Sequence, residues 1–247
     1  KNLEIDEGRW PAKQTQWFIG GQKDEGRRAA HLQRTGDLHT DTLIKIYTAY
    51  EDACQRGGLV DFGELLLRSH EIWLNKPELL AHYQQRFRFL LVDEFQDTNT
   101  IQYAWLRVLA GEKAFVTAVG DDDQSIYGWR GAQIENIQRF TEHFSNVHTV
   151  RLEQNYRSTA TILKAANAVI DNNRGRMGKE LWTDSVEGDL ISVFAAFNEQ
   201  EEARFIVDRI SVWVEGGGMR KDCALLHRSN AQSRALEEAL LQRGLPY

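Results

Sequence analysis

The chain has 247 residues, 42% of them hydrophobic and 27% charged, which is typical of a globular protein with one large domain or two modest ones. No apolar run approaches the roughly 20 residues of a membrane-spanning helix, and two widely spaced cysteines support neither a disulfide framework nor a zinc site. The net charge of −6 argues weakly against a nucleic-acid partner, although a narrow basic strip on an acidic body is compatible with it. The cysteine usage suits a reducing, cytoplasmic compartment.

Roughly the first 85 residues are predicted to be helical. Helices are expected at about 11–23, 40–56, 62–74 and 77–86. In the second of these, Thr40 or Asp41 can cap the start and Gly57-Gly58 can end it. The pair Arg27-Arg28 fits a solvated face better than a phosphate contact.

After residue 86 the pattern changes to strand, helix and strand, at about 88–92, 99–109 and 114–119. Apolar runs of this length are typical of parallel strands that are buried on both faces. A right-handed crossover places the carboxyl ends of both strands at one edge of the sheet, where α/β proteins bind ligands.

Both strands run into acids. Asp93 and Glu94 follow the first, and Asp121–Asp123 with Gln124 follow the second. Asp93 can hold a divalent metal while Glu94 polarises an attacking water, a pairing found in enzymes that hydrolyse nucleoside triphosphates. Gln124 can hydrogen-bond a terminal phosphate or that water. The alternative is a solvated acidic turn, which we prefer over metal binding for at least two of Asp121–Asp123.

The rest of the chain is predicted to alternate strands and helices. Strands are expected at 149–152, 190–197 and 223–226, and helices at 158–170, 199–214 and 231–243. The loop 124–132 carries aromatic residues that are either core residues or platforms for unstacked bases. Arg157, after the third strand, can offset charge in phosphoryl transfer, and Tyr156 offers a ring to a purine.

Five stretches carry motifs of a known family: Leu91–Thr98, Val119–Ala132, Arg151–Thr159, Leu59–Leu66 and Arg228–Arg234. They resemble, in that order, motifs II, III, IV, Ic and IVa of the superfamily 1A DNA helicases of the UvrD/PcrA/Rep type. The second stretch, 14 residues long, is very specific, and the likeness covers nearly the whole chain.

The resemblance implies an α/β fold, with RecA-like parallel-sheet P-loop NTPase motor domains and an all-helical subdomain. Residues 1–84 would be part of helical subdomain 1B, 85–150 the C-terminal part of motor domain 1A, and 151–247 the N-terminal part of motor domain 2A. It also implies an ATP- and Mg²⁺-dependent 3′–5′ helicase and translocase in DNA repair or replication. Its partners would be single-stranded DNA, single/double-strand junctions and repair proteins, with no membrane, and its location the nucleoid of the cytoplasm.

The same resemblance assigns five residues to the nucleotide. Asp93 would coordinate Mg²⁺ and Glu94 would be the catalytic base. Gln124 would sense the γ-phosphate. Tyr156 would stack on adenine, and Arg157 would be the arginine finger of the second motor domain.

Five further residues are assigned to DNA. Tyr127, Trp129 and Arg130 would link the ATP site to the DNA strand. Arg228 and Asn230 would contact the DNA backbone. His227 stands where a tyrosine is common in the family, and no role is assigned to it.

Several elements of the family pattern are missing from the sequence. No Gly-x-x-x-x-Gly-Lys-Ser/Thr occurs, and the only Gly-Lys pair, Gly178-Lys179, is followed by Glu180. The adenine-binding Gln motif and motifs V and VI are also absent. We therefore expect the chain to be an internal fragment of a longer protein, without meaningful ATP turnover by itself.

Two alternatives to a helicase stay open. A two-metal nuclease could use Asp93, Glu94, Asp97 and Asp121–Asp123, but it leaves Gln124 and Arg157 unexplained. A non-catalytic module that binds single-stranded DNA or protein would retain the aromatic loop and lose the motor chemistry. Asp97 suits a loop-fixing hydrogen bond as well as a nucleotide contact.

Overall fold

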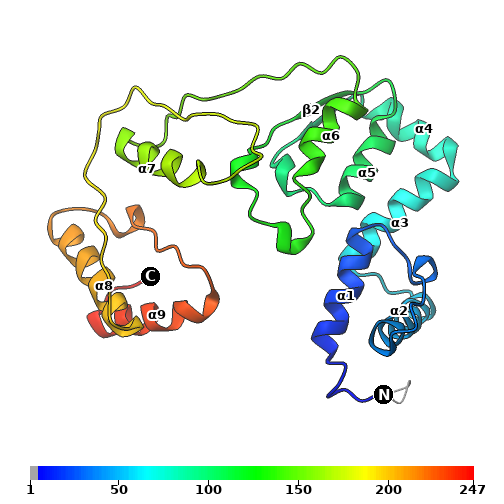
Figure 1. Ribbon diagram of the computed structural model, residues 1–247, viewed down its shortest axis with the longest axis horizontal. Helices are drawn as coiled ribbons and strands as arrows, with labels where there is room; N and C mark the ends of the chain where they lie inside the picture. Colours follow the sequence, from blue (N-terminus) through cyan, green and yellow to red (C-terminus); the bar gives the residue numbers. More distant parts are fainter. Residues whose placement is uncertain (1–4) are drawn as a thin grey trace. The chain divides into compact units, whose positions relative to one another are not determined.

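The computed structural model describes residues 5–247 and divides into two compact units (Figure 1). The first unit holds the chain up to Glu153 together with Ala168–Glu180, and the second holds Gln154–Asn167 and Leu181–Tyr247. The segment Ala168–Glu180, called the returning segment below, therefore belongs to the first unit although it follows residues of the second. Among the described residues, no helix has both the length and the apolar character needed to cross a membrane.

The first unit begins with the four helices that the sequence predicts. They are α1 (Ala12–Asp24), α2 (Leu38–Gly57), α3 (Phe62–Asn75) and α4 (Pro77–Arg86). Gly58 ends α2 in the left-handed region, at φ 62°, as predicted. The predicted cap is wrong, because the Asp37 side chain accepts the Thr40 amide and the helix begins earlier, at Leu38.

A buried ion network joins α1, α2 and α3. It consists of Lys23, Arg28, Glu51, Asp61, Glu64, Arg68 and Glu71. Lys23 and Glu64 are 3% and 4% exposed, and 2.9 Å separates Lys23 Nζ from Glu64 Oε2. The expectation that Arg28 lies on a solvated face is wrong, because acids from α2 and α3 draw its guanidinium inward.

The sheet of the first unit has two parallel strands, β1 (Phe89–Val92) and β2 (Phe115–Ala118). Helix α5 (Thr100–Ala110) connects them, so the predicted strand–helix–strand unit is confirmed. Asn99 caps α5 in a reciprocal pair with Gln102.

One face of this sheet is packed and the other is exposed. The helices α5 and α6 (Glu135–His143) lie beside β2 (Figure 1) and cover the inward side chains of both strands. The outward residues Phe89, Leu91 and Phe115 are 68%, 81% and 66% exposed. The prediction of two covered faces is wrong for the described residues, which supply helices to one face only.

The second unit is built on helices. Helix α7 (Ala160–Ile170) begins in it, and α8 (Glu199–Glu215) packs on α9 (Ser233–Arg243) through Ala203, Val207, Ala239 and Leu240. The predicted strands 190–197 and 223–226, and the strand 149–152 of the first unit, are not formed in the described structure. A parallel strand needs hydrogen-bonded neighbours, and here Val193, Phe197 and Leu226 stay 93%, 96% and 95% exposed. The α/β class is therefore carried by the small parallel sheet of the first unit alone.

Candidate active site

Both acid-bearing turns leave the same edge of the β1–β2 sheet. The strands run parallel in the register Val92 to Ala118, and the ladder continues as the Val119 amide donates to the Val92 carbonyl over 2.8 Å. The Phe95 amide then donates to the Val119 carbonyl over 2.9 Å. This edge brings the turn at Asp93 beside the turn at Asp121, as the crossover geometry predicts.

A glutamine that the sequence analysis did not single out joins the two turns. Gln96 is 1% exposed, and its Nε2 donates to Glu94 Oε2 over 2.8 Å. Its Oε1 accepts the Asp121 amide over 2.9 Å. A Cβ at Gly120 would lie 2.9 Å from the same Oε1, so the contact depends on glycine there. The only sequence signal for Gln96 is a neutral amide among the acids of the first turn.

Glu94 has an unusual backbone conformation. It is a non-glycine residue at φ 50°, in the left-handed region, which costs on the order of 1–3 kcal/mol and is typical of functional sites. Phe95, 2% exposed, anchors the chain directly after it. The Glu94 amide donates to Asp93 Oδ1 over 2.9 Å, and both carboxylates lie at the surface. The turn thus presents two adjacent carboxylates to solvent at a fixed angle.

The donor set of this turn suits Mg²⁺. Carboxylate oxygens are the protein ligands that this ion prefers, and it commonly uses one or two of them and keeps several waters. Asp93 offers an exposed carboxylate, and Asp97 Oδ1 is buried with no hydrogen-bond partner among the described residues. The loop-fixing role considered for the Asp97 carboxylate is therefore not seen at this oxygen.

The second turn is held by cations of the returning segment. Arg176 pairs with Asp123 through two bonds, Nε to Oδ1 at 2.9 Å and Nη2 to Oδ2 at 2.7 Å. Lys179 Nζ pairs with Asp121 Oδ1. Burial alone would raise the pKa of Asp121, but the hydrogen bonds from Lys179 and Gln124 outweigh it and lower that pKa. The expectation of a solvated acidic turn is wrong.

These contacts also bear on metal binding at the second turn. Carboxylate oxygens of Asp121, Asp122 and Asp123 lie within 4.8 Å of one another, a spacing that could hold an ion. Each carboxylate is already engaged, since the Met177 amide donates to Asp122 Oδ2 over 2.6 Å. The nuclease alternative thereby loses part of its ligand set.

Gln124 ends the second turn with an exposed side chain. It closes a 3₁₀ turn over Asp122–Gln124, and its Nε2 donates to Asp121 Oδ2 over 2.7 Å. No other hydrogen bond restrains this amide group among the described residues. Gln124 is therefore close to the sheet edge and less constrained than Gln96.

The aromatic loop that follows is exposed. Tyr127 and Trp129 are 37% and 76% exposed, which argues against a role as core residues. Arg130 Cζ lies 5.4 Å from the Tyr127 ring centroid and 4.7 Å from that of Trp129. Two rings and one cation at a surface are suited to bases and phosphates of single-stranded nucleic acid.

The remaining predicted site residues lie in the second unit. Tyr156 is 85% exposed, and its hydroxyl donates to Gln154 Oε1 over 2.7 Å. The Asn155 side chain accepts the Arg157 amide over 2.9 Å, and the Arg157 guanidinium has no ion pair within the described part of this unit. The convergence of Arg157 with Glu94 stays a prediction, because each belongs to a different unit.

Arg228 and Asn230 are also exposed. They flank Ser229, and the Gln232 side chain accepts the amides of Arg228 and Ser229 over 3.0 and 3.1 Å. His227 Nδ1 lies 2.9 Å from the Ser229 carbonyl, so the histidine is part of the same local turn.

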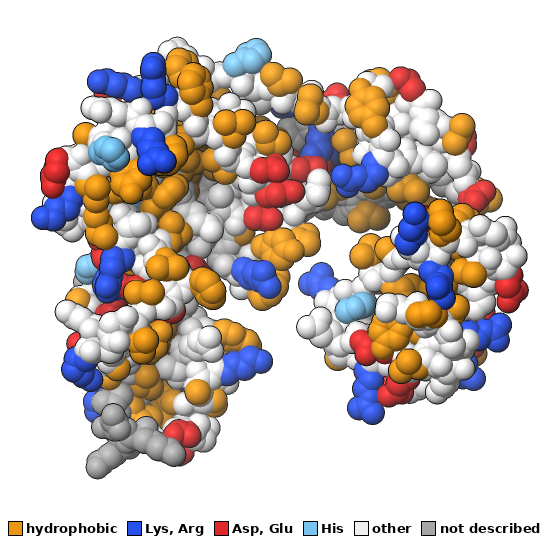
Figure 2. Space-filling view, turned by 180° about the vertical axis from the view of Figure 1, so that it is seen from behind, with side chains coloured by type: hydrophobic (Ala, Val, Ile, Leu, Met, Phe, Trp, Pro, Cys, Tyr) orange, Lys and Arg blue, Asp and Glu red, His pale blue; other side chains and the backbone are white. Residues whose placement is uncertain are grey.

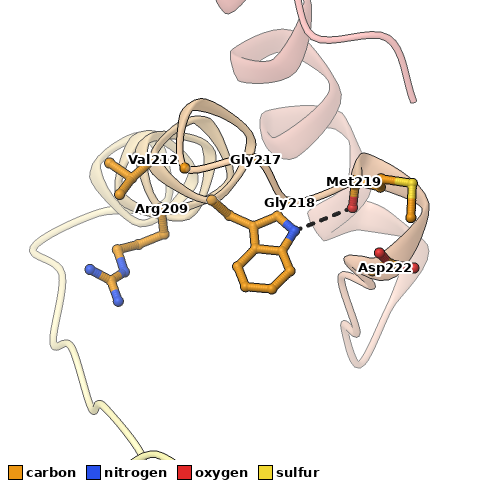
Figure 3. A pocket seen from close by; sticks show the side chains of 8 residues that line it. Arg209, Val212, Gly217, Gly218, Met219 and Asp222 are labelled. Carbon is orange, nitrogen blue, oxygen red and sulfur yellow. Dashed lines mark hydrogen bonds between the residues drawn. The ribbon is translucent and has the colours of Figure 1, made fainter.

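Among the described residues, the two most clearly formed cavities lie in the second unit, and neither includes a predicted catalytic residue. The larger of the two, about 570 Å³, lies at the glycine turn after α8, and Arg209, Trp213 and Asp222 are among the residues that line it (Figure 3). The indole N–H donates to the Met219 carbonyl over 3.3 Å, and a Cβ at Gly218 would lie 2.2 Å from the ring. The polar groups do not converge, so this hollow is better explained by the packing of the turn than by a ligand.

Comparison with known proteins assigns the family. Residues 1–145 match the UvrD/REP helicase N-terminal domain, and residues 150–247 match the UvrD-like helicase C-terminal domain. The chain belongs to the UvrD/REP helicase family. It is 62% identical over 247 residues to DNA helicase II of Salmonella typhimurium and 61% identical to DNA helicase II of Escherichia coli. It is 40% identical over 248 residues to the ATP-dependent DNA helicase PcrA of Staphylococcus aureus.

In all three comparisons the match covers 100% of this chain and 34% of the relative. The chain thus spans about a third of the length of these UvrD-family proteins. The N-terminal family domain, matched by residues 1–145, contains the whole sheet edge described above.

Proposed function

We propose that this chain is part of an ATP-dependent DNA helicase that translocates 3′ to 5′ on single-stranded DNA, in DNA repair or replication. The proposal rests on one observation above others. Parallel strands bring the Asp93-Glu94 turn beside the turn that ends in Gln124, and Gln96 ties the two together. Family membership and the names of the relatives support the same activity.

We further propose that the sheet belongs to a RecA-like P-loop motor domain. In this proposal residues 1–84 are part of helical subdomain 1B, 85–150 are part of motor domain 1A, and 151–247 are part of motor domain 2A. Two features support it. The helices α1–α4 precede the first strand along the chain, and the exposed face of the sheet offers a surface on which further elements can pack. The phosphate loop would be contributed by sequence outside these 247 residues.

The proposed chemistry divides the work between named groups. Asp93 would hold Mg²⁺, which when bound supplies positive charge to the phosphates. Glu94 polarises the attacking water, and its carboxylate is kept in place by Gln96. Gln124 contacts the terminal phosphate, Tyr156 stacks on adenine, and Arg157 offsets the charge that develops in transfer.

DNA would bind through stacking and a few phosphate contacts. Tyr127, Trp129 and Arg130 form the platform, while Arg228 and Asn230 contact the backbone. On the face shown in Figure 2, Lys and Arg side chains lie in small groups among acidic and hydrophobic ones. Stacking of bases on the exposed rings does not depend on the net charge of the chain, so the value of −6 is compatible with this mode of binding. We propose single-stranded DNA, strand junctions and repair proteins as partners, and the nucleoid as the location.

A non-catalytic DNA-binding module is the second candidate function, because the exposed aromatic loop by itself serves either role. The strained backbone of Glu94 and its contact with a buried amide favour the helicase over a module without catalysis, because DNA binding by the aromatic loop requires neither feature. The nuclease is disfavoured by the cations on Asp121 and Asp123.

The experiment that tests the proposal measures DNA-stimulated ATP hydrolysis by the whole protein. We expect Glu94→Gln to lower kcat at least a hundredfold while ATP still binds, because the substitution removes a general base and keeps the shape of the side chain. Glu112→Gln is the matched control: this exposed acid precedes β2, at the opposite end of the strand from the site. Undiminished turnover in Glu94→Gln would contradict the assignment.

A further inference from the structure

Two cations of the returning segment pair with two acids of the second acidic turn. The proposed roles leave both parts largely unexplained: of the second turn only Gln124 has a role at the nucleotide, and no residue of the returning segment has one. Yet Arg176 and Lys179 carry the two cations that reach the turn, across more than 50 residues of intervening chain. The segment follows residues of the second unit and packs with the first.

Arg176 is the anchor of this contact. Its guanidinium binds both oxygens of Asp123, and these two side chains are 15% and 12% exposed. Its Nη2 also donates to the Lys179 carbonyl over 2.6 Å, which fixes the backbone that carries the lysine. Lys179 is therefore delivered to the turn by contacts that do not involve its own ammonium group.

Lys179 and Gln124 share one carboxylate. Asp121 Oδ1 accepts the Asp123 amide over 3.0 Å and the Lys179 ammonium, while Oδ2 accepts Gln124 Nε2 over 2.7 Å. An amide that is bonded to Asp121 in this way must release it before it can reach a terminal phosphate. Asp121 stays ionised, but the positive charge of Lys179 at Oδ1 offsets part of the negative potential at Oδ2 and so weakens the attraction between Asp121 and the Gln124 amide.

We propose that Lys179 is a positioning residue for Gln124: by neutralising Asp121, it keeps the glutamine side chain available to the terminal phosphate of the nucleotide. The inference rests on the proposed function. Arg176 is the residue that places Lys179, and Asp121 is the competitor for the glutamine amide. The returning segment thus contributes to nucleotide sensing without contacting the nucleotide.

The proposal makes an unusual prediction for paired substitutions. Lys179→Met leaves Asp121 uncompensated, so Gln124 is held more tightly and contact with the terminal phosphate is lost. Asp121→Asn can keep the Oδ1 that accepts the Asp123 amide, and it removes the charge that holds Gln124. The double variant should therefore recover what the single lysine substitution loses.

The test uses the whole protein and equilibrium binding of ADP and of a non-hydrolysable ATP analogue, alongside kcat and KM for ATP. For Lys179→Met we expect the analogue to bind about tenfold more weakly and kcat to be about tenfold lower than in wild type. A tenfold change corresponds to the loss of about one hydrogen bond to a charged group. Binding of ADP should stay within about twofold of wild type. Asp121→Asn/Lys179→Met should return to within about threefold of wild type. Lys164→Met is the matched control, because Lys164 pairs with Glu187 at 3.1 Å on an exposed surface.

Other outcomes refute the proposal. Equal losses of affinity for ADP and the analogue would show that Lys179 only stabilises the local structure. A double variant that stays as impaired as Lys179→Met would show the same. Lys179→Gln gives the same test if the methionine variant does not fold. A wild-type protein that neither binds nor hydrolyses ATP would overturn the proposed function, and this inference with it.

Discussion

Glu64 lies at the centre of the ion network in the helical part of the first unit. Its carboxylate, 4% exposed, receives three cations: Lys23 Nζ at 2.9 Å, Arg28 Nη1 at 2.8 Å and Arg68 Nη2 at 2.8 Å. Burial alone would raise its pKa, but the hydrogen bonds from Arg28 and Lys23 outweigh burial and lower it from 4.5 to about 2. Glu64→Gln removes this charge with little change of shape.

The cost of that substitution can be worked out in two ways. A pKa that falls from 4.5 to about 2 corresponds to roughly 3 kcal/mol of folding free energy, at about 1.4 kcal/mol per pH unit. Removing one partner from a buried ion pair costs about 3–5 kcal/mol. We therefore expect Glu64→Gln to lower the free energy of unfolding by about 3 kcal/mol near neutral pH. Glu112→Gln is the matched control: this exposed acid of the first unit takes part in no ion pair among the described residues, and its substitution should change the free energy of unfolding by at most about 0.5 kcal/mol.

The pH dependence has a definite sign. Because the pKa of Glu64 is lower in the folded state, its contribution is complete above about pH 4.5 and disappears as the pH falls toward about 2. The difference between wild type and Glu64→Gln should shrink over that window. The assay is urea unfolding followed by tryptophan fluorescence. Among the seven tryptophans, Trp73 is 7% exposed, and its ring centroid lies 4.7 Å from that of Trp105 within the first unit. Equal losses for the Glu64 and Glu112 variants, or a difference that persists at pH 2, would refute this reasoning.

Two further predictions concern DNA and nucleotide. Trp129→Ala should weaken binding of single-stranded DNA by about 1–3 kcal/mol in a fluorescence anisotropy titration. Trp17→Ala is the control and should leave binding unchanged, because this ring is 66% exposed on α1. No loss of affinity in Trp129→Ala would show that the loop is not a DNA platform. The 247-residue chain alone should hydrolyse ATP at background rate in a steady-state phosphate-release assay, because its sequence has no Gly-x-x-x-x-Gly-Lys-Ser/Thr; steady turnover that vanishes in Glu94→Gln would contradict this.

The sequence predicted the features that depend on neighbours along the chain. Helices α1–α5 and α7–α9 follow from apolar spacing, and the end of α2 at Gly58 follows from glycine chemistry. Helix α6 was missed although Ile137, Phe140 and Phe144 recur at helical spacing and pack on the sheet. The missed helix is the element that covers β2 beside α5.

Features that depend on distant residues were not predictable in the same way. An apolar run such as 190–197 has the composition of a strand, but composition does not supply the neighbours that a strand must pair with. Nor does any local pattern show that Lys179 will neutralise Asp121, or that Gln96 will bond to two turns at once. The motifs predict where the chemistry lies, and that assignment stays a prediction, while the contacts that position these residues came from the fold.

The two glutamines of the candidate site differ in how firmly they are held, which bears on the proposed response to nucleotide. Gln96 is 1% exposed and bonded at both ends of its amide, so Glu94 and the second turn are fixed relative to each other. Gln124 is exposed and has one side-chain bond, to a carboxylate that Lys179 also occupies. A change of hydrogen-bond partner is therefore far less costly for Gln124 than for Glu94, whose displacement would break a buried contact. Under the proposed roles, the base would therefore stay in place through the cycle, and the response to the terminal phosphate would begin at Gln124, three residues before the aromatic loop that starts at Tyr127.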